Sequence, residues 1–343
     1  MICNVGILGP GFVATRAVLP ALQRVPRARL LAVASRDSER AQAVARQFGI
    51  ERIYNDYQTL LDDRDVDAVY LALPNHLHHL WTLRAAEAGK HVLCEKPLAL
   101  NSAECDEMIA ACQRAQVLLM EAVMYRFHPR MLFLKQMLEN GELGAPHLLH
   151  LAFSFPFNAP ANYRAKKEYG GGALLDVGSY CIHAARWLTG AEPQHMQGVT
   201  RKKDGIDVDT QALLSFDGSV IAHIQCSFTA AEHQVIEVVG STGAVTAPLA
   251  FTAWTEDLTT LLVQQGSHFE QRTFAAADPY EAMAAHFIDC VLGEATLCFP
   301  PTDSRGTLEV IDQLRKRCIE LDEESMTYVP AWNRYPAYRR WYP

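Results

Sequence analysis

An apolar segment, residues 2–8, leads directly into Gly9-Pro10-Gly11-Phe12-Val13-Ala14. Helical spacing follows from residue 13 to about residue 24, so the glycines lie at a turn between a strand and a helix. At such a turn the first glycine permits tight bending and the second lets the backbone approach a pyrophosphate, while Ala14 keeps the helix close to the sheet. The pattern is weak evidence alone, but strand-then-helix is the context that it requires. The sequence therefore predicts a dinucleotide site at Gly9, Gly11, Phe12 and Val13.

The rest of the first 124 residues alternates short apolar runs with segments of helical spacing. Expected strands cover residues 29–34, 68–73, 91–94 and 117–120, and expected helices cover residues 38–48 and 78–88, with another beginning at Ser102. Repeated strand–helix alternation indicates right-handed βαβ units and a parallel sheet. We expect an α/β fold in which residues 1–124 form a Rossmann dinucleotide-binding domain.

The pattern changes after residue 124. Segments 147–155, 211–216 and 234–239 follow one another as expected antiparallel strands, with helices expected at residues 172–188 and 279–292. Residues 125–343 are thus predicted to form an α+β domain for substrate binding and oligomerisation, built on an open, mainly antiparallel sheet. One face of such a sheet needs cover, which favours a homodimer or homotetramer that packs through it.

Composition excludes several functional classes. The 343 residues carry a formal net charge of −8 with scattered Lys and Arg, which argues against a nucleic-acid surface. No apolar run reaches the length of a membrane span and no signal sequence opens the chain, so we expect a cytoplasmic protein without a membrane partner. Nine dispersed cysteines without a Cys-x-x-Cys pair favour reduced thiols. The histidines at positions 76, 78 and 79 have no complementary ligands at a familiar spacing, so we expect no metal.

The end of the second expected strand indicates which dinucleotide binds. An NAD site would place an acidic residue there, to bind the ribose 2′-hydroxyl. This chain has Ser35 and Arg36 instead, which can donate to a 2′-phosphate. We therefore expect NADP(H), with NAD(H) as the lesser alternative. In the simpler interpretation, Arg36 is a solvated charge and Asp37 caps a helix.

Two segments carry candidate catalytic groups. Glu95-Lys96-Pro97 follows an expected strand, where open α/β sheets place their ligands, and a lysine there can polarise a carbonyl or hydroxyl. In a helix after Gly170-Gly171-Gly172, the residues Asp176, Tyr180 and His183 would share one face and suit proton transfer. The alternative is a buried tyrosine bonded to the aspartate beside a core histidine.

Together these motifs resemble the Gfo/Idh/MocA oxidoreductases. The resemblance extends from Gly9 to about Leu292 and includes segments 74–78, 88–97, 120–129 and 170–183. Within the family, the sequence is most similar to dimeric dihydrodiol dehydrogenases and NADP-dependent aldose (xylose-type) dehydrogenases.

The resemblance implies roles for individual residues. Lys96 corresponds to the catalytic lysine and Asp176 helps to hold it. Tyr180 stands where inositol dehydrogenases have histidine, as in the dihydrodiol and glucose–fructose branches, and is expected to transfer the proton. Further cofactor contacts are expected from Leu73, Asn75, His78, Glu95, Lys96 and Arg126. Substrate contacts are expected from Tyr163, Arg164 and His183. A domain-crossing salt bridge is the alternative for Arg126.

The expected function is hydride transfer to or from a hydroxyl or carbonyl carbon of a sugar, keto-sugar or cyclic diol. A reductase of keto-sugars linked to a nucleotide is the runner-up, and a non-catalytic NADP(H)-binding sensor is the alternative outside enzymes. Lys96, Asp176 and Tyr180 together favour the enzyme. The aromatic and arginine-rich segment 328–343 favours packing on another domain or subunit over base stacking, and no role is assigned to it.

Overall fold

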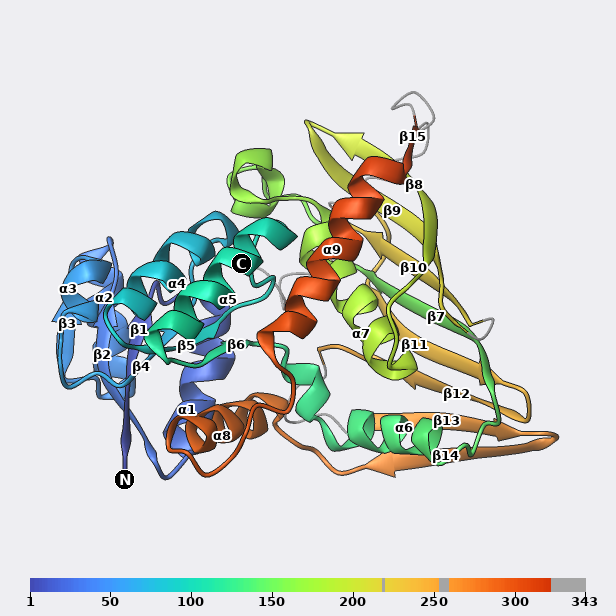
Figure 1. Ribbon diagram of the computed structural model, residues 1–343, viewed down its shortest axis with the longest axis horizontal. Coiled ribbons are helices and arrows are strands. Elements are labelled where there is room, and N and C mark those ends of the chain that lie inside the picture. The colour runs from blue at the N-terminus through green and yellow to red at the C-terminus, as the bar shows by residue number, and fades with distance from the viewer. Residues whose placement is uncertain (218–219, 253–258, 322–343) are drawn as a thin grey trace.

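The computed structural model describes residues 1–217, 220–252 and 259–321 (Figure 1). The aromatic segment 328–343, noted above, lies outside the described residues. Two sheets organise the chain. The first has six strands, all parallel, in the order β3-β2-β1-β4-β5-β6. Its strands are β1 Cys3–Leu8, β2 Ala28–Ala34, β3 Arg52–Tyr54, β4 Ala68–Leu71, β5 His91–Cys94 and β6 Leu119–Glu121.

Helices connect these strands as the alternation predicts. A π-helical turn, Ala14–Val18, continues into α1, and a short 3₁₀ turn, Asn75–Leu77, precedes α4. Side-chain caps begin two of these helices: Asp37 accepts from the Arg40 amide at α2, and Asp56 accepts from the Thr59 amide at α3. The α-helices of this half are α1 Leu19–Arg24, α2 Ser38–Phe48, α3 Tyr57–Leu61, α4 His78–Glu87 and α5 Ser102–Ala115.

The second sheet has nine strands in the order β14-β13-β12-β11-β7-β10-β9-β8-β15. Most neighbours are antiparallel, but β7 pairs parallel with β10, and β15 pairs parallel with β8. Because β7 lies between β10 and β11, it interrupts the expected meander at a point that local patterning does not reveal. The strands are β7 Pro146–Ser154, β8 His195–Lys203, β9 Ile206–Ser215, β10 Ile221–Ser227, β11 His233–Gly240, β12 Gly243–Pro248, β13 Thr259–Gln265, β14 His268–Phe274 and β15 Ile319–Leu321.

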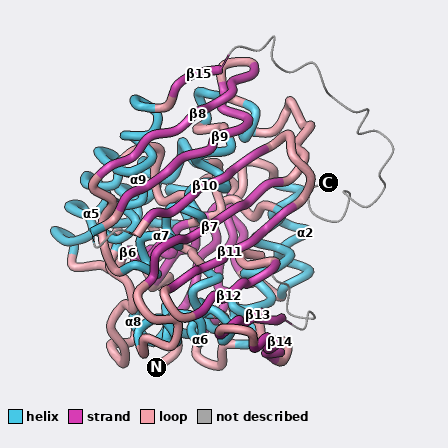
Figure 2. Tube along the Cα trace, turned by 90° about the vertical axis from the view of Figure 1, so that its right-hand side faces the viewer, coloured by secondary structure: helices cyan, strands magenta, loops and turns pink. Residues whose placement is uncertain are grey.

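The two sheets face each other across a helical layer. Figure 1 shows α7, Ser179–Thr189, and α9, Pro301–Arg317, between the sheets, and α9 contacts α5, α7 and β8. Helix α8, Pro279–Val291, packs on α1, and α6, Pro129–Glu139, packs on β13. Figure 2 shows the opposite face of the larger sheet with none of the described helices in front of it. The predicted α/β class, a parallel Rossmann sheet plus an open, mainly antiparallel sheet, is confirmed.

Membrane insertion through a helix finds no support in the described ranges. No helix there combines the length and the apolar character that a membrane crossing needs.

Candidate active site

The glycine turn after β1 has the geometry that the motif predicts. Gly9 adopts φ +73°, and a Cβ at this position would lie 2.3 Å from Leu73 Cδ2, so both conformation and space require glycine. At Gly11 the nearest atom to such a Cβ would be 3.8 Å away. Ala14 is fully buried and keeps the helix against the sheet. The turn therefore leaves the Gly11 backbone open, and Phe12 is partly exposed beside it.

The end of β2 separates two of the expected roles. Ser35 is 6% exposed and its Oγ accepts from the Asp37 amide at 3.1 Å. Asp37 in turn caps α2 by accepting from the Arg40 amide at 3.0 Å. Arg36 is exposed at the carboxyl edge of the sheet. The capping role considered for Asp37 is therefore present, while Arg36 is accessible from solvent.

Lys96 lies directly after β5 and points into a cluster that spans both halves of the chain. Its Nζ donates to Asp176 Oδ1 and to the Asp176 carbonyl, both at 2.9 Å. Arg164 Nε donates to the other carboxylate oxygen of Asp176 at 2.8 Å. Burial alone would raise the pKa of Asp176, but the positive charges of Arg164 and Lys96 outweigh it and lower this pKa to about 2. Asp176 is therefore ionised and shared by two cations.

Tyr180 lies one helical turn after Asp176, and its ring faces the lysine. Lys96 Nζ is 4.7 Å from the ring centroid, and the Tyr180 hydroxyl points to Met124 Sδ at 3.8 Å. Phe153 and Phe251 each pack against the ring with centroids 5.5 Å apart. An ammonium held over a phenol favours negative charge on that phenol. The structure thus brings Lys96, Asp176 and Tyr180 together.

A π-helical turn, Leu174–Gly178, carries Asp176 to the lysine. Asp207 on β9 accepts from the Leu174 amide at 2.5 Å and fixes the start of this turn. Gly172 adopts φ +112°, and a Cβ there would lie 2.2 Å from Asp207 Oδ1. Sequence reasoning did not find Asp207, Met124, Phe153 or Phe251. The glycine triplet was the one available signal, because it marks a crowded backbone.

His183 lies apart from this cluster. It is 3% exposed, accepts or donates at Nδ1 with the Tyr125 hydroxyl at 2.6 Å, and places Nε2 3.7 Å from Asp303 Oδ2. Burial and then the charges of Arg126 and Arg186 hold the pKa of His183 well below its usual value. His183 is thus an enclosed imidazole that contacts side chains of the protein, and its contact with substrate stays a prediction.

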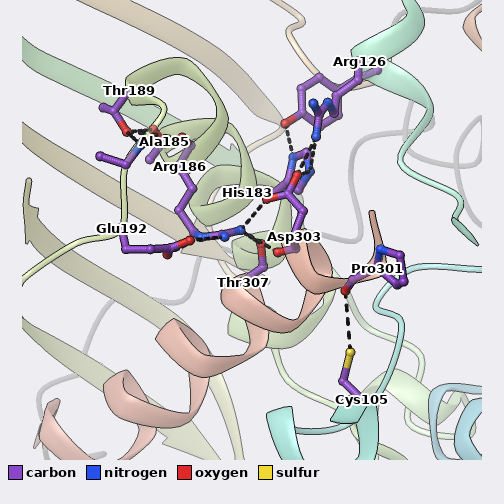
Figure 3. Close-up of polar contacts among 12 residues, drawn as sticks. Cys105, Arg126, His183, Ala185, Arg186, Thr189, Glu192, Pro301, Asp303 and Thr307 are labelled. Carbon is purple, nitrogen blue, oxygen red and sulfur yellow. Dashed lines mark hydrogen bonds and ion pairs between the residues drawn. The ribbon is translucent and has the colours of Figure 1, made fainter. Parts of the chain in front are cut away.

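Arg126 forms a salt bridge, which was the alternative to a ligand contact, but its partner Asp303 lies in the same predicted domain, residues 125–343. Its Nη1 donates to Asp303 Oδ2 at 2.6 Å, and its guanidinium lies 4.3 Å from the Phe299 ring centroid. Asp303, on α9, also pairs with Arg186 of α7 at 3.0 Å (Figure 3). The Arg126–Asp303 pair therefore joins the segment that follows β6 to α9 within that domain.

Two polar side chains that follow β4 are buried against backbone carbonyls, one of them next to Lys96. His78 is fully buried, and its two ring nitrogens each lie 2.8 Å from a backbone carbonyl, those of Pro97 and Leu73. Asn75 is 2% exposed and its Nδ2 donates to the Gly170 carbonyl at 3.0 Å. These side chains were expected to contact the cofactor directly. Their polar atoms contact the backbone carbonyls of Pro97, Leu73 and Gly170, and contact of either side chain with the cofactor stays a prediction.

Two further carboxyl groups brace the same strand ends. Glu95 accepts from the Tyr70 hydroxyl at 2.6 Å, and burial raises the pKa of Glu95. Glu121, at the end of β6, is 6% exposed and accepts from the Leu98 amide at 2.8 Å. Burial raises the pKa of Glu121 to about 7. Unlike Asp176, neither carboxylate has a direct ion pair among the described contacts.

The remaining histidines near the site have partners of other kinds. His79 lies 2.8 Å from Glu107, and His76 stacks on Tyr169 with ring centroids 4.4 Å apart. Within the described ranges, no three His, Cys, Asp or Glu side chains are grouped so that they could hold a metal ion. A cavity of about 400 Å³ lies beside Gly170 and Gly171, but Lys96, Asp176 and Tyr180 are not among the residues that line it.

Comparison with known proteins agrees with the fold. Residues 3–123 match the model of the oxidoreductase family with an NAD-binding Rossmann fold, and residues 131–246 match the Gfo/Idh/MocA C-terminal domain. The chain is 34% identical to D-xylose 1-dehydrogenase (NADP(+)) 2 of Haloferax volcanii, over 90% of this chain and 95% of that protein.

A second curated protein and a solved structure are also similar to this chain. Trans-1,2-dihydrobenzene-1,2-diol dehydrogenase of Danio rerio is 35% identical, over 72% of this chain and 73% of its own length. The solved structure of KijD10, a 3-ketoreductase from Actinomadura kijaniata in complex with NADP and TDP-benzene, superposes with a TM-score of 0.89 at 32% identity, covering 94% of this chain and 99% of that one. The family predicted from the motifs is confirmed: the chain belongs to the Gfo/Idh/MocA oxidoreductases.

Proposed function

We propose that the protein is an NADP(H)-dependent dehydrogenase or reductase that transfers a hydride to or from a carbonyl or hydroxyl carbon of a sugar, keto-sugar or cyclic diol. The observation that carries the proposal is the cluster of Lys96, Asp176 and Tyr180 at the carboxyl end of β5, on the same sheet edge as the glycine turn. Ligands of open parallel sheets bind at this edge. Relatives named for xylose and for dihydrodiols support the substrate class.

The glycine turn fits a dinucleotide. A side chain at position 11 would project over the open turn, so glycine leaves room for a pyrophosphate beside Gly9, Phe12 and Val13. At the end of β2, the Ser35 hydroxyl and the exposed Arg36 guanidinium suit a 2′-phosphate, and neither residue is acidic. The NADP bound to KijD10 and the NADP(+) dependence named for the xylose dehydrogenase support NADP(H) over NAD(H).

The residues of the chain supply the proton chemistry. NADP(H) bound at this edge supplies or accepts the hydride. During reduction, the Tyr180 hydroxyl gives its proton to the substrate oxygen; during oxidation, the phenolate takes that proton back. Lys96, held over the ring by Asp176, stabilises the phenolate and the negative charge that develops on the substrate oxygen. Asp176 acts through Lys96 and is a positioning residue.

A second candidate is reduction of a keto-sugar that is linked to a nucleotide. The similarity to KijD10, a 3-ketoreductase solved with TDP-benzene, favours it. A non-catalytic sensor would bind NADPH without using the lysine and the tyrosine.

Turnover assays separate these candidates. NADPH oxidation would be measured with aldoses, keto-sugars and a nucleotide-linked keto-sugar, and NADP⁺ reduction with aldoses and cyclic diols. We expect turnover with one of these classes. Tight NADPH binding with no turnover in any class would favour the sensor.

We also propose that residues 1–124 bind the dinucleotide and that residues 125–343 bind substrate and mediate self-association through the uncovered sheet face. Leu148, Leu213 and Ile221 are 40%, 54% and 44% exposed on adjacent strands of that face. Light scattering of the wild type and Ile221→Glu would test the association. We expect a dimer or tetramer that the charged side chain weakens, and a monomeric wild type would contradict it.

A further inference from the structure

A segment between β7 and the π-helical turn Leu174–Gly178 crosses from the larger sheet to the Rossmann half. We call residues 163–172 the strap. Its Gly170 carbonyl accepts from Asn75 Nδ2 at 3.0 Å, and its Tyr169 ring stacks on His76 at 4.4 Å. A Cβ at Gly170 would lie 2.1 Å from Leu100 Cδ2, so the strap contacts the Rossmann half closely. The strap therefore docks on the loop that follows β4, at the sheet edge proposed for the cofactor.

The backbone of the strap fixes one arginine in place. The Arg164 carbonyl accepts from the Gly172 amide at 3.0 Å, and the Arg164 amide donates to Asn162 Oδ1 at 3.0 Å. A Cβ at Gly171 would lie 2.4 Å from the Arg164 carbonyl oxygen, so a larger residue would open this fold. Arg164 itself is 8% exposed. Docking of the strap thus delivers the guanidinium to Asp176, where its Nε binds Oδ2 at 2.8 Å.

The arginine changes the charge of the cluster. Lys96 and Asp176 alone would form a neutral pair, in which the carboxylate weakens the positive field of Lys96 at the Tyr180 ring. With Arg164 on the second carboxylate oxygen, two cations share one anion and the cluster keeps one net positive charge. The three side chains are 14%, 3% and 9% exposed, so water screens this charge only weakly.

We propose that Arg164 is a positioning residue which keeps the Lys96–Asp176 pair net positive beside Tyr180 and makes that charge depend on docking of the strap. The inference rests on the proposed roles of Lys96 and Tyr180. Other titratable groups near the cluster are Glu95 and Glu121, from the ends of β5 and β6, and Tyr125, whose ring centroid is 6.0 Å from that of Tyr180. Substitution at position 164 leaves all three in the chain.

The first test detects the charge of the cluster through its effect on the titration of Tyr180. The second test measures the reaction. Ultraviolet difference spectra between each protein and its Tyr180→Phe counterpart report formation of the Tyr180 phenolate without any turnover. In Arg164→Met, we expect the phenolate to form about 0.5 to 1 pH unit higher than in the wild type. Arg164→Lys should restore most of that difference because it keeps the charge. Arg201→Met, which removes a half-buried arginine paired with Asp209 at 2.8 Å on the larger sheet, is the matched control and should leave the phenolate titration unchanged.

Kinetics then connect the charge to catalysis. We expect Arg164→Met to lower kcat about 10- to 100-fold with a smaller change in KM, and added guanidinium ions to restore part of kcat. A folded Arg164→Met protein with the wild-type phenolate titration overturns the inference and assigns Arg164 a purely structural role. If the phenolate titration shifts as expected but the wild type turns over no substrate, the inference stands and the proposed function fails.

Discussion

The glycine turn and the cluster of Lys96, Asp176 and Tyr180 are built in opposite ways. The turn, together with the end of β2, uses short contiguous segments, residues 9–14 and 35–37, whose backbone conformation and caps are local. The cluster joins Lys96 to Asp176, 80 residues later, and depends on two sheets that pack against shared helices. We call the glycine turn with the end of β2 the contiguous site, and the Lys96 cluster the distributed site. The contiguous site depends on which residues fit the conformation of a short segment. The distributed site depends on the packing of distant segments, so its charges are influenced by neighbours that no local motif contains.

The largest expected effect removes the proton donor from the distributed site. Tyr180→Phe should lower kcat about 10²- to 10⁴-fold, the usual contribution of a positioned general acid or base. The contiguous site should be unaffected, so the Kd for NADPH should stay within about threefold of wild type. Stopped-flow turnover and fluorescence titration measure the two quantities. Unchanged kcat in a folded variant would remove Tyr180 from the mechanism.

The next effect concerns the contiguous site alone. Arg36→Ala should weaken NADPH binding about 30- to 100-fold, because a charged hydrogen bond to a 2′-phosphate contributes about 2–3 kcal/mol. NADH binding should change little, since NADH has no phosphate there. Arg46→Ala, an exposed arginine later on α2, is the matched control. Equal loss of affinity for both dinucleotides would contradict recognition of the 2′-phosphate.

A smaller effect concerns two carboxylates near Lys96, those of Glu121 and Asp176, which should change the stability of the protein in opposite directions as the pH changes. The pKa of Glu121 is raised to about 7, so its protonated form is favoured in the folded protein. Its contribution to stability is complete below about pH 4.5 and is lost as pH rises through about 7. Glu121→Gln keeps an acceptor for the Leu98 amide without the charge. Between pH 5 and pH 8, the free energy of unfolding of the wild type should fall by about 1–2 kcal/mol more than that of Glu121→Gln.

Denaturant titrations at several pH values measure this difference. Glu39→Gln, on an exposed part of α2, should follow the wild type. Asp176 has the opposite shift, to a pKa of about 2, so its stabilisation is present above about pH 4 and disappears as the pH falls toward 2. If Glu121→Gln and wild type have parallel stability profiles, Glu121 is ionised near its ordinary pKa in the folded protein.

The smallest effect tests the cap inside the contiguous site. Asp37→Ala should lower the free energy of unfolding by about 1 kcal/mol, because α2 loses its side-chain cap, while Asp37→Asn should keep most of it. Neither variant should alter the ratio of NADPH to NADH affinity. A change in that ratio would show that Asp37, rather than Ser35 and Arg36, faces the ribose.

The sequence predicts the backbone geometry of the contiguous site, because most of it is set by residues that are neighbours in the chain. Gly9 is required by its φ and by Leu73, and Asp37 by the helix that it begins. The sequence also indicates the strand–helix alternation of the first half and the open sheet of the second. Local patterning does not place β7 between β10 and β11, since the pairing of distant strands decides that order.

The distributed site is predicted by residue type but not by contact. Lys96, Asp176 and Tyr180 are found from motif and resemblance, yet the Arg164 partner of Asp176 depends on the path of the strap. The sequence also does not show that the polar atoms of His78 and Asn75 contact the carbonyls of Pro97, Leu73 and Gly170, because these contacts join segments far apart in the chain. Only the packed fold shows whether a polar side chain meets a ligand or supports a loop.

Lys96 has the central role in the proposed hydride-transfer reaction, because it stabilises the negative charge on Tyr180 and on the substrate oxygen. One substitution tests this role most directly. Substrate turnover and NADPH binding would be measured for the wild type and Lys96→Met on the class of substrate that the wild type uses. We predict that Lys96→Met binds NADPH within about threefold of wild type and loses about 10²- to 10³-fold in kcat, because its ammonium acts chiefly in the transition state. A folded Lys96→Met enzyme with wild-type kcat would contradict the account.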